Sequence, residues 1–157
     1  MYVVNNPYKR FGVFFENGIF TYDMKGKEGE DKIRMNFEST ALLKILLDRS
    51  VVEAEKINMD YKVYGIKRDK IIDIGTVFGI DGRISIGILP ADEERVACVL
   101  IGFHKEDKDI SIVLKPKKVA MLSTLIMKYL IENIENELNK RLEVSKDQNI
   151  SSIKDTY

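Results

Sequence analysis

Basic and aromatic side chains alternate in several short stretches of this chain, and these stretches are the best candidates for a binding site. The clearest stretch is Tyr61-Lys62-Val63-Tyr64, which is followed closely by further cations. Cations neutralise phosphates and aromatic rings stack on unpaired bases, each stack contributing about 1–3 kcal/mol. The pattern predicts a surface for single-stranded nucleic acid, although mixed charge is equally common on an ordinary solvated sheet face. The candidate binding residues are Tyr8, Lys9, Arg10, Lys32, Arg34, Lys62, Tyr64, Lys67, Arg68, Lys70 and Arg83.

Residues typical of enzyme sites are scarce. The one histidine, His104, is expected as a solvated imidazole in a polar turn, which leaves no histidine pair for a metal and no Ser-His-Asp triad. Asp92-Glu93-Glu94 is expected to be a solvated acidic turn, because three consecutive carboxylates do not converge on one cation. Gly26-Lys27-Glu28-Gly29 lacks the spacing and context of a phosphate-binding loop. No catalytic residue, metal site or cofactor is therefore expected, and the protein is not expected to be an enzyme.

The elements that position the candidate residues repeat along the chain. The apolar pattern of residues 19–47 matches that of residues 98–126 without a gap, at a shift of 79 positions (98 − 19 = 79). Each half reads as a strand, a polar loop, a strand and then a helix. The pattern predicts an α+β fold made of a duplicated unit, antiparallel strands then a helix, over about residues 8–56 and 61–130.

The first half begins with a confident hairpin, because Asn17-Gly18 supplies the positive backbone angles of a tight turn. The next strand alternates strictly, so Lys32 and Arg34 are displayed on one face. A helix capped by Ser39 or Thr40 follows and is expected to run through residue 47 or as far as residue 56. The sequence predicts strands over residues 11–15, 19–24 and 32–37 and a loop over residues 25–31.

The second half is predicted to open with a basic hairpin, strands 61–66 and 70–75 around a turn at 67–69. Further strands are expected over residues 83–89, 96–103 and 110–114. A long helix follows Pro116, over about residues 117–143. Its apolar stripe continues past residue 130 and needs a partner surface, so a homo-oligomer, a dimer or tetramer, is expected. The domain is expected to span residues 1–144, with a disordered tail over residues 145–157.

The bulk composition is that of an ordinary globular protein. The 157 residues suit one domain, and the 25 basic and 25 acidic side chains leave no net charge. This balance disfavours a strongly electrostatic nucleic-acid binder unless charge is concentrated on particular faces. The single cysteine, Cys98, excludes an internal disulfide and is expected to be a core thiol. No signal peptide or membrane-spanning segment is recognisable, so we expect a cytoplasmic protein without membrane contact.

The layout resembles the Whirly and PUR-type single-stranded nucleic-acid-binding proteins, and PC4-type transcriptional coactivators make the same unit by dimerising one copy. The resemblance covers about residues 8–130. It is clearest where the strand at 110–114 passes through Lys-Pro-Lys-Lys into an apolar helix. Lys25-Gly26-Lys27 is similar to an element of plant Whirly proteins, but here it is expected in a loop, so no site is transferred from it. The first half also shows three clear strands where the family has four, unless residues 1–4 supply one.

The resemblance implies two antiparallel sheets around a helical centre, with single strands bound across and between the sheets. It also implies self-association through the helices and a role in replication, repair, recombination or transcription. The neutral net charge and the absence of tryptophan differ from the composition expected of such a binder.

Two functional hypotheses remain open. The first is a non-enzymatic single-stranded DNA-binding protein, with RNA as an alternative ligand. The second is a structural or protein-interaction module that self-assembles through its long C-terminal helix. The feature that distinguishes them is whether one concave face contains Arg34, Lys62, Tyr64 and the turn at 67–68. In an interaction module, carboxylates would interrupt that face.

Overall fold

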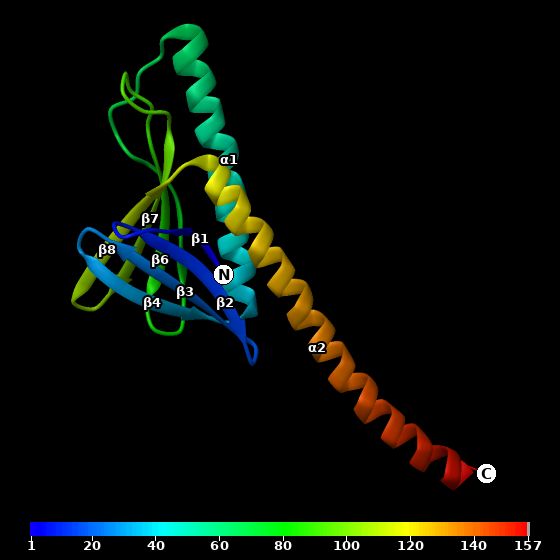
Figure 1. The fold of residues 1–157 in the computed structure, drawn as a ribbon. Helices are drawn as coiled ribbons and strands as arrows, with labels where there is room; N and C mark the ends of the chain where they lie inside the picture. The colour runs from blue at the N-terminus through cyan, green and yellow to red at the C-terminus, as the bar shows by residue number, and fades with distance from the viewer. Residues whose placement is uncertain (157) are drawn as a thin grey trace.

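Four antiparallel strands followed by one helix occur twice along the chain (Figure 1). The computed structural model describes the backbone of residues 1–156 and the side chains of residues 1–147. The elements are β1 Tyr2–Asn5, β2 Arg10–Glu16, β3 Ile19–Gly26, β4 Gly29–Met35, α1 Phe37–Tyr64, β5 Ile72–Phe78, β6 Arg83–Leu89, β7 Cys98–Lys105, β8 Lys108–Leu114 and α2 Pro116–Thr156.

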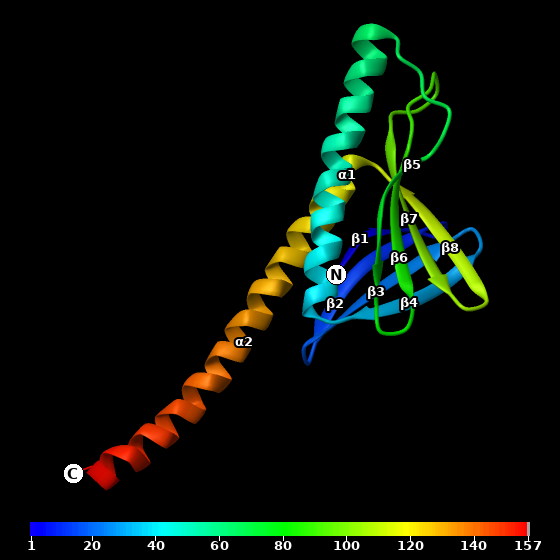
Figure 2. The same ribbon diagram turned by 180° about the vertical axis from the view of Figure 1, so that it is seen from behind.

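Each set of four strands forms its own sheet. Sheet 1 has the order β1-β2-β3-β4 and sheet 2 has the order β5-β6-β7-β8, with antiparallel neighbours throughout. Both sheets lie on the same side of α1, and the sheet 1 strands cross those of sheet 2 (Figures 1 and 2). The edge strand β8 of sheet 2 therefore faces sheet 1 and has no strand partner on that side.

The two halves match in residue boundaries as well as in order. A shift of 79 residues (98 − 19 = 79) carries the limits of β3 and β4 onto those of β7 and β8, and the start of α1 onto the start of α2. Strands β2 and β6 differ by 73 residues instead (83 − 10 = 73), because residues 17–18 connect β2 to β3 whereas residues 90–97 connect β6 to β7. The repeat expected from the apolar pattern is thus present as the same succession of elements.

The core lies between the inner faces of the two sheets and the inner faces of the helices. Phe11 of β2 meets Phe103 of β7 edge-on, with ring centroids 5.8 Å apart. Leu43 of α1 and Leu122 of α2 are buried in the same cluster. Alternation along each strand sends one row of side chains into this cluster and the other row to the outer face of its sheet.

Helix α1 is longer than the sequence indicates, and this corrects the predicted hairpin at 61–75. Asn36, rather than Ser39 or Thr40, caps its start, since the Asn36 side chain accepts a hydrogen bond from the Ser39 N–H at 2.9 Å. Gly65 ends the helix with φ 66°, the left-handed conformation that glycine adopts most readily. The aromatic and β-branched residues 61–64 favour a strand locally, but they continue a helix that packs on the core.

Three other predicted boundaries change. The expected loop over 25–31 is a tight hairpin, because β3 continues to Gly26 and β4 begins at Gly29. Residues 1–4 do contribute the fourth strand of sheet 1, and β5 begins at Ile72 and ends at Phe78.

Helix α2 leaves the core after Leu130 and extends away from both sheets (Figure 2). Its backbone remains helical to Thr156, through most of the stretch expected to be a disordered tail, and Tyr157 lies outside the described residues. In the described part of the chain, neither helix has a stretch long and apolar enough to cross a membrane.

Candidate nucleic-acid interface

A groove of about 650 Å³ runs between the two sheets, where β8 faces the β1–β2 connection and the β3–β4 hairpin. Sheet 1 supplies one wall through residues before β2 and at the end of β3. Sheet 2 supplies the other wall through the middle of β8. The lining residues are Pro7, Tyr8, Lys9, Lys25, Gly26, Lys27, Glu28, Ser111, Ile112 and Val113.

Close contact between backbone and lysine side chains holds these walls together. At Gly26 an added Cβ would overlap the carbonyl oxygen of Ser111, so the hairpin approaches β8 as closely as a glycine permits. Lys9 Nζ donates to the Val113 carbonyl at 3.1 Å, and Lys108 Nζ donates to the Glu30 carbonyl at 2.7 Å. A lysine of sheet 1 thus bonds a carbonyl of β8, and a lysine of β8 bonds a carbonyl of β4, so the two hydrogen bonds link the walls in both directions.

The groove carries cations and one freely exposed aromatic ring. Lys25 and Lys27 form no ion pair with any residue whose side chain the structure describes. Tyr8 is 85% exposed. The Asn6 side chain accepts hydrogen bonds from the Tyr8 and Lys9 backbone N–H groups, both at 2.9 Å, and this turn presents the Tyr8 ring to solvent.

Arg10 lies beside the groove but is engaged within sheet 1. Its guanidinium pairs with Asp23 at 3.1 Å and with Glu30 at 2.9 Å, and these hydrogen bonds raise the pKa of Arg10. Asp23 is itself buried and also accepts the Tyr2 hydroxyl at 2.9 Å. Two carboxylates thus neutralise the charge of Arg10, which makes it a poorer phosphate ligand than the groove lysines.

Lys32 and Arg34 occupy the outer face of β4, as the alternation predicts, and both are exposed. Arg34, however, pairs through Nε with Asp81 of the β5–β6 connection at 3.0 Å, and its backbone N–H donates to the same carboxylate at 2.8 Å. Arg83 lies on the outer face of β6, opposite His104 in the strand register.

The remaining candidates, Lys62, Tyr64, Lys67, Arg68 and Lys70, gather at the far end of α1. The helix has 28 residues, so at about 1.5 Å per residue its two ends lie about 40 Å apart. Arg34 sits before its start, and Lys67 is paired with Glu93 at 3.1 Å. Arg34 therefore does not share one concave face with Lys62, Tyr64 and the turn at 67–68, which is the feature that distinguishes the two functional hypotheses.

Lys25 and Lys27 were missed by the residue pattern, because their segment read as a loop. The structure places Lys25 and Gly26 inside β3, with Lys27 in the turn that follows. The expectation that Lys25-Gly26-Lys27 lies wholly in a loop is therefore wrong for Lys25 and Gly26.

His104 also departs from its prediction. It belongs to β7, not to the polar turn, and its imidazole is hydrogen-bonded on both nitrogens, to Ser85 and to Asp109. The reading of His104 as a solvated loop imidazole is therefore wrong.

Comparison with models of known protein families found no match, and comparison with curated protein sequences found none either.

Proposed function

We propose that this protein binds single-stranded nucleic acid in the groove between its two sheets. The observation that carries the proposal is that Lys9, Lys25 and Lys27 and the exposed ring of Tyr8 line one groove of about 650 Å³. Cations along a groove follow a phosphate backbone, and an exposed aromatic ring gives an unpaired base a stacking surface.

Charge distribution supports this site despite the neutral chain. The groove has three lysines against one carboxylate, Glu28, whereas two of the other basic candidates, Arg34 and Lys67, are paired with carboxylates. A local excess of cations attracts a polyanion even where the whole molecule carries no net charge. The alternation of four strands and a helix also agrees with the Whirly-like arrangement that the sequence suggests.

A single strand suits the groove better than a duplex does. Only unpaired bases expose faces on which Tyr8 can stack. The groove lies along the junction of two sheets rather than on a helix that could enter a major groove. We therefore propose a single strand as the ligand, with DNA as the leading candidate and RNA as the alternative.

A second candidate function, self-assembly, rests on the outer stripe of α1, which lies opposite the face that packs on the core. Apolar side chains recur on it at spacings typical of a helix interface. All are more than half exposed, namely Leu42, Ile45, Val52, Met59 and Val63. We propose that two or more copies of the chain associate through this stripe and the extended part of α2, with a strand bound in each groove.

Fluorescence anisotropy with a labelled oligonucleotide tests the binding function. A single strand should compete better than a duplex of the same length. Tyr8→Ala should weaken binding by about 1–3 kcal/mol, equivalent to about 5- to 150-fold, because one stacking partner is removed. Phe78→Ala is the control, because Phe78 is another largely exposed aromatic, 73% against 85% for Tyr8, and lies outside the groove. Equal competition by duplex, or no binding at low salt, would favour self-assembly alone.

A further inference from the structure

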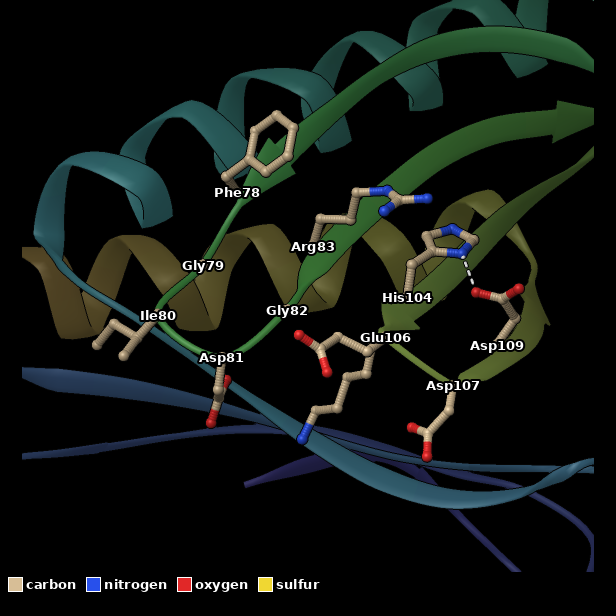
Figure 3. Close-up of a pocket in the computed structure, with 11 residues that line it drawn as sticks. Phe78, Gly79, Ile80, Asp81, Gly82, Arg83, His104, Glu106, Asp107 and Asp109 are labelled. Carbon is tan, nitrogen blue, oxygen red and sulfur yellow. Dashed lines mark hydrogen bonds and ion pairs between the residues drawn. The ribbon is translucent and has the colours of Figure 1, made fainter.

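Ser85, His104 and Asp109 form a continuous hydrogen-bonded chain across three neighbouring strands of sheet 2. Ser85 Oγ lies 2.7 Å from His104 Nε2, and His104 Nδ1 lies 2.8 Å from Asp109 Oδ1. Figure 3 shows the imidazole turned toward Asp109, with Arg83 beside it. The order of atoms, hydroxyl to Nε2 and Nδ1 to carboxylate, is that of a serine nucleophile with its base and the group that orients the base.

The strand register produces this arrangement. His104 pairs directly with Asp109 on one side and with Arg83 on the other, while Ser85 lies one row further along β6. The imidazole reaches Ser85 diagonally, across the position of Gly102. A Cβ at Gly102 would come within 2.6 Å of Ser85 Oγ and 2.7 Å of His104 Nε2. The missing side chain at Gly102 is what leaves room for the bond between Ser85 and His104.

The fold itself does not require these residues. Sheet 1 has Gly12 where sheet 2 has Ser85 (85 − 73 = 12), and Lys25 where sheet 2 has His104 (104 − 79 = 25). The same strand positions thus build a sheet without a hydroxyl or an imidazole. Inward neighbours of Ser85, such as Ile84 and Ile86, are buried, which leaves the hydrogen-bonded chain on the outer face and outside the core.

The surroundings supply access and one unpaired guanidinium among the residues whose side chains are described, that of Arg83. Ser85 is half-buried, and the side chain of His104 is 24% exposed. Arg83, His104 and Asp109 line a cleft of about 750 Å³ beside Ser85, together with the exposed ring of Phe78 and the carboxylates Asp81, Glu106 and Asp107. Arg83 forms no ion pair with any residue whose side chain is described. Its guanidinium is free to attract an anionic group on a ligand.

We propose that Ser85 is an activated nucleophile that cleaves small carboxylic esters carrying a negatively charged group. Ser85 Oγ attacks the ester carbonyl carbon while its proton moves to His104 Nε2. The bond from that carbon to the alkoxy oxygen breaks, and the leaving alcohol takes the proton from Nε2. Water then attacks the acyl-serine and gives a proton to Nε2, the carbon–Oγ bond breaks, and Oγ takes the proton back as the acid departs. Asp109 acts as a positioning residue for the imidazole, and Arg83 holds the anionic group.

This site is distinct from the groove between the sheets, and its test does not depend on nucleic-acid binding. The full chain is incubated with a fluorophosphonate, whose P–F bond breaks as Oγ bonds to phosphorus and fluoride leaves. Mass spectrometry should locate the adduct on Ser85. His104→Ala and Gly102→Ala should slow labelling about 100-fold, as loss of a general base does. Thr76→Ala removes a hydroxyl that lies opposite Ser85 in the strand register, and this variant should label at the wild-type rate.

Separate variants test the positioning role of Asp109 and the anion-binding role of Arg83. Asp109→Asn should slow labelling at Ser85, and Asp109→Glu should restore it, which a purely structural role would not show. A 4-nitrophenyl monoester of a dicarboxylic acid should be hydrolysed faster than the neutral acetate, and Arg83→Leu should remove that preference. Circular dichroism checks that each variant is folded. No adduct on Ser85, or the same labelling rate in folded His104→Ala, would overturn the proposal.

Discussion

Gly26 of β3 lies against the carbonyl oxygen of Ser111 in β8, closely enough that a methyl group in place of the glycine hydrogen would overlap that oxygen. The contact joins the last residue of a strand in sheet 1 to the free edge of sheet 2. Lys25 precedes it and Lys27 follows it, so the same approach sets the position of both lysines in the groove. This backbone contact between the two repeats therefore sets how closely the walls of the proposed binding site approach at the hairpin.

Gly26→Ala should destabilise the protein by about 1–3 kcal/mol, because the sheets must move apart to admit the methyl group. Urea denaturation followed by circular dichroism measures the change. Lys27→Ala, in the same hairpin, changes no backbone contact and should stay within about 0.5 kcal/mol of the wild type. Equal stability of Gly26→Ala and the wild type would contradict the close approach.

Two carboxylates that join the sheets should make folding sensitive to acid. Asp31 of β4 accepts a hydrogen bond from Lys105 Nζ at 2.9 Å, and Asp81 pairs with Arg34. Burial raises the pKa of Asp31, but hydrogen bonds from Lys105 and from a backbone N–H outweigh it and hold the pKa below its ordinary value. The pKa of Asp81 is lowered in the same way, with burial opposed by hydrogen bonds from Arg34.

Because these folded-state pKa values lie below the unfolded value of about 3.9, the stabilisation is complete above that pH and is lost as the pH falls through the folded-state values. Each pair should contribute about 0.5–1 kcal/mol, as partly exposed ion pairs do. The double variant Asp31→Asn with Asp81→Asn should be less stable at pH 7 and should lose less stability between pH 5 and pH 2. If the free energies of unfolding of wild type and variant fall in parallel below pH 4, these carboxylates do not have this role.

Self-association should depend on the outer stripe of α1. Leu42→Asp with Ile45→Asp places charge on two exposed positions and should lower the molecular mass measured by light scattering at micromolar concentration. Val96→Asp is the matched control, since Val96 is also about half exposed but lies in the β6–β7 connection. A wild-type chain that is already a monomer at that concentration would refute the self-assembly proposal.

The sequence predicts the fold well where apolar residues alternate or recur without interruption. Ile19–Gly26 and Cys98–Lys105 were both recognisable because their inward positions are apolar in each repeat. The end of α1 was not recognisable, because residues 61–64 favour a strand locally while the helix continues through them to the Gly65 cap.

The candidate site was less predictable than the fold. The groove depends on the approach of Gly26 to Ser111, which are 85 residues apart in the chain (111 − 26 = 85). The ion pairs could not be predicted from the sequence either, because Asp81 comes close to Arg34, and Glu93 to Lys67, only in the folded chain. The pattern therefore identified Tyr8 and Lys9 beside the groove, but it also selected cations that carboxylates neutralise.

The most direct test of groove binding is the salt dependence of single-strand affinity in two double variants with the same change in charge. Lys25→Ala with Lys27→Ala removes two groove cations, and Lys62→Ala with Arg68→Ala removes two at the far end of α1. Each phosphate contact contributes about −0.7 to the slope of log affinity against log salt for a single strand. The groove variant should therefore bind more weakly, with a slope shallower by about 1.4, while the α1 variant should keep the wild-type slope. The opposite result, an unchanged slope in the groove variant and a shallower slope in the α1 variant, would contradict the account.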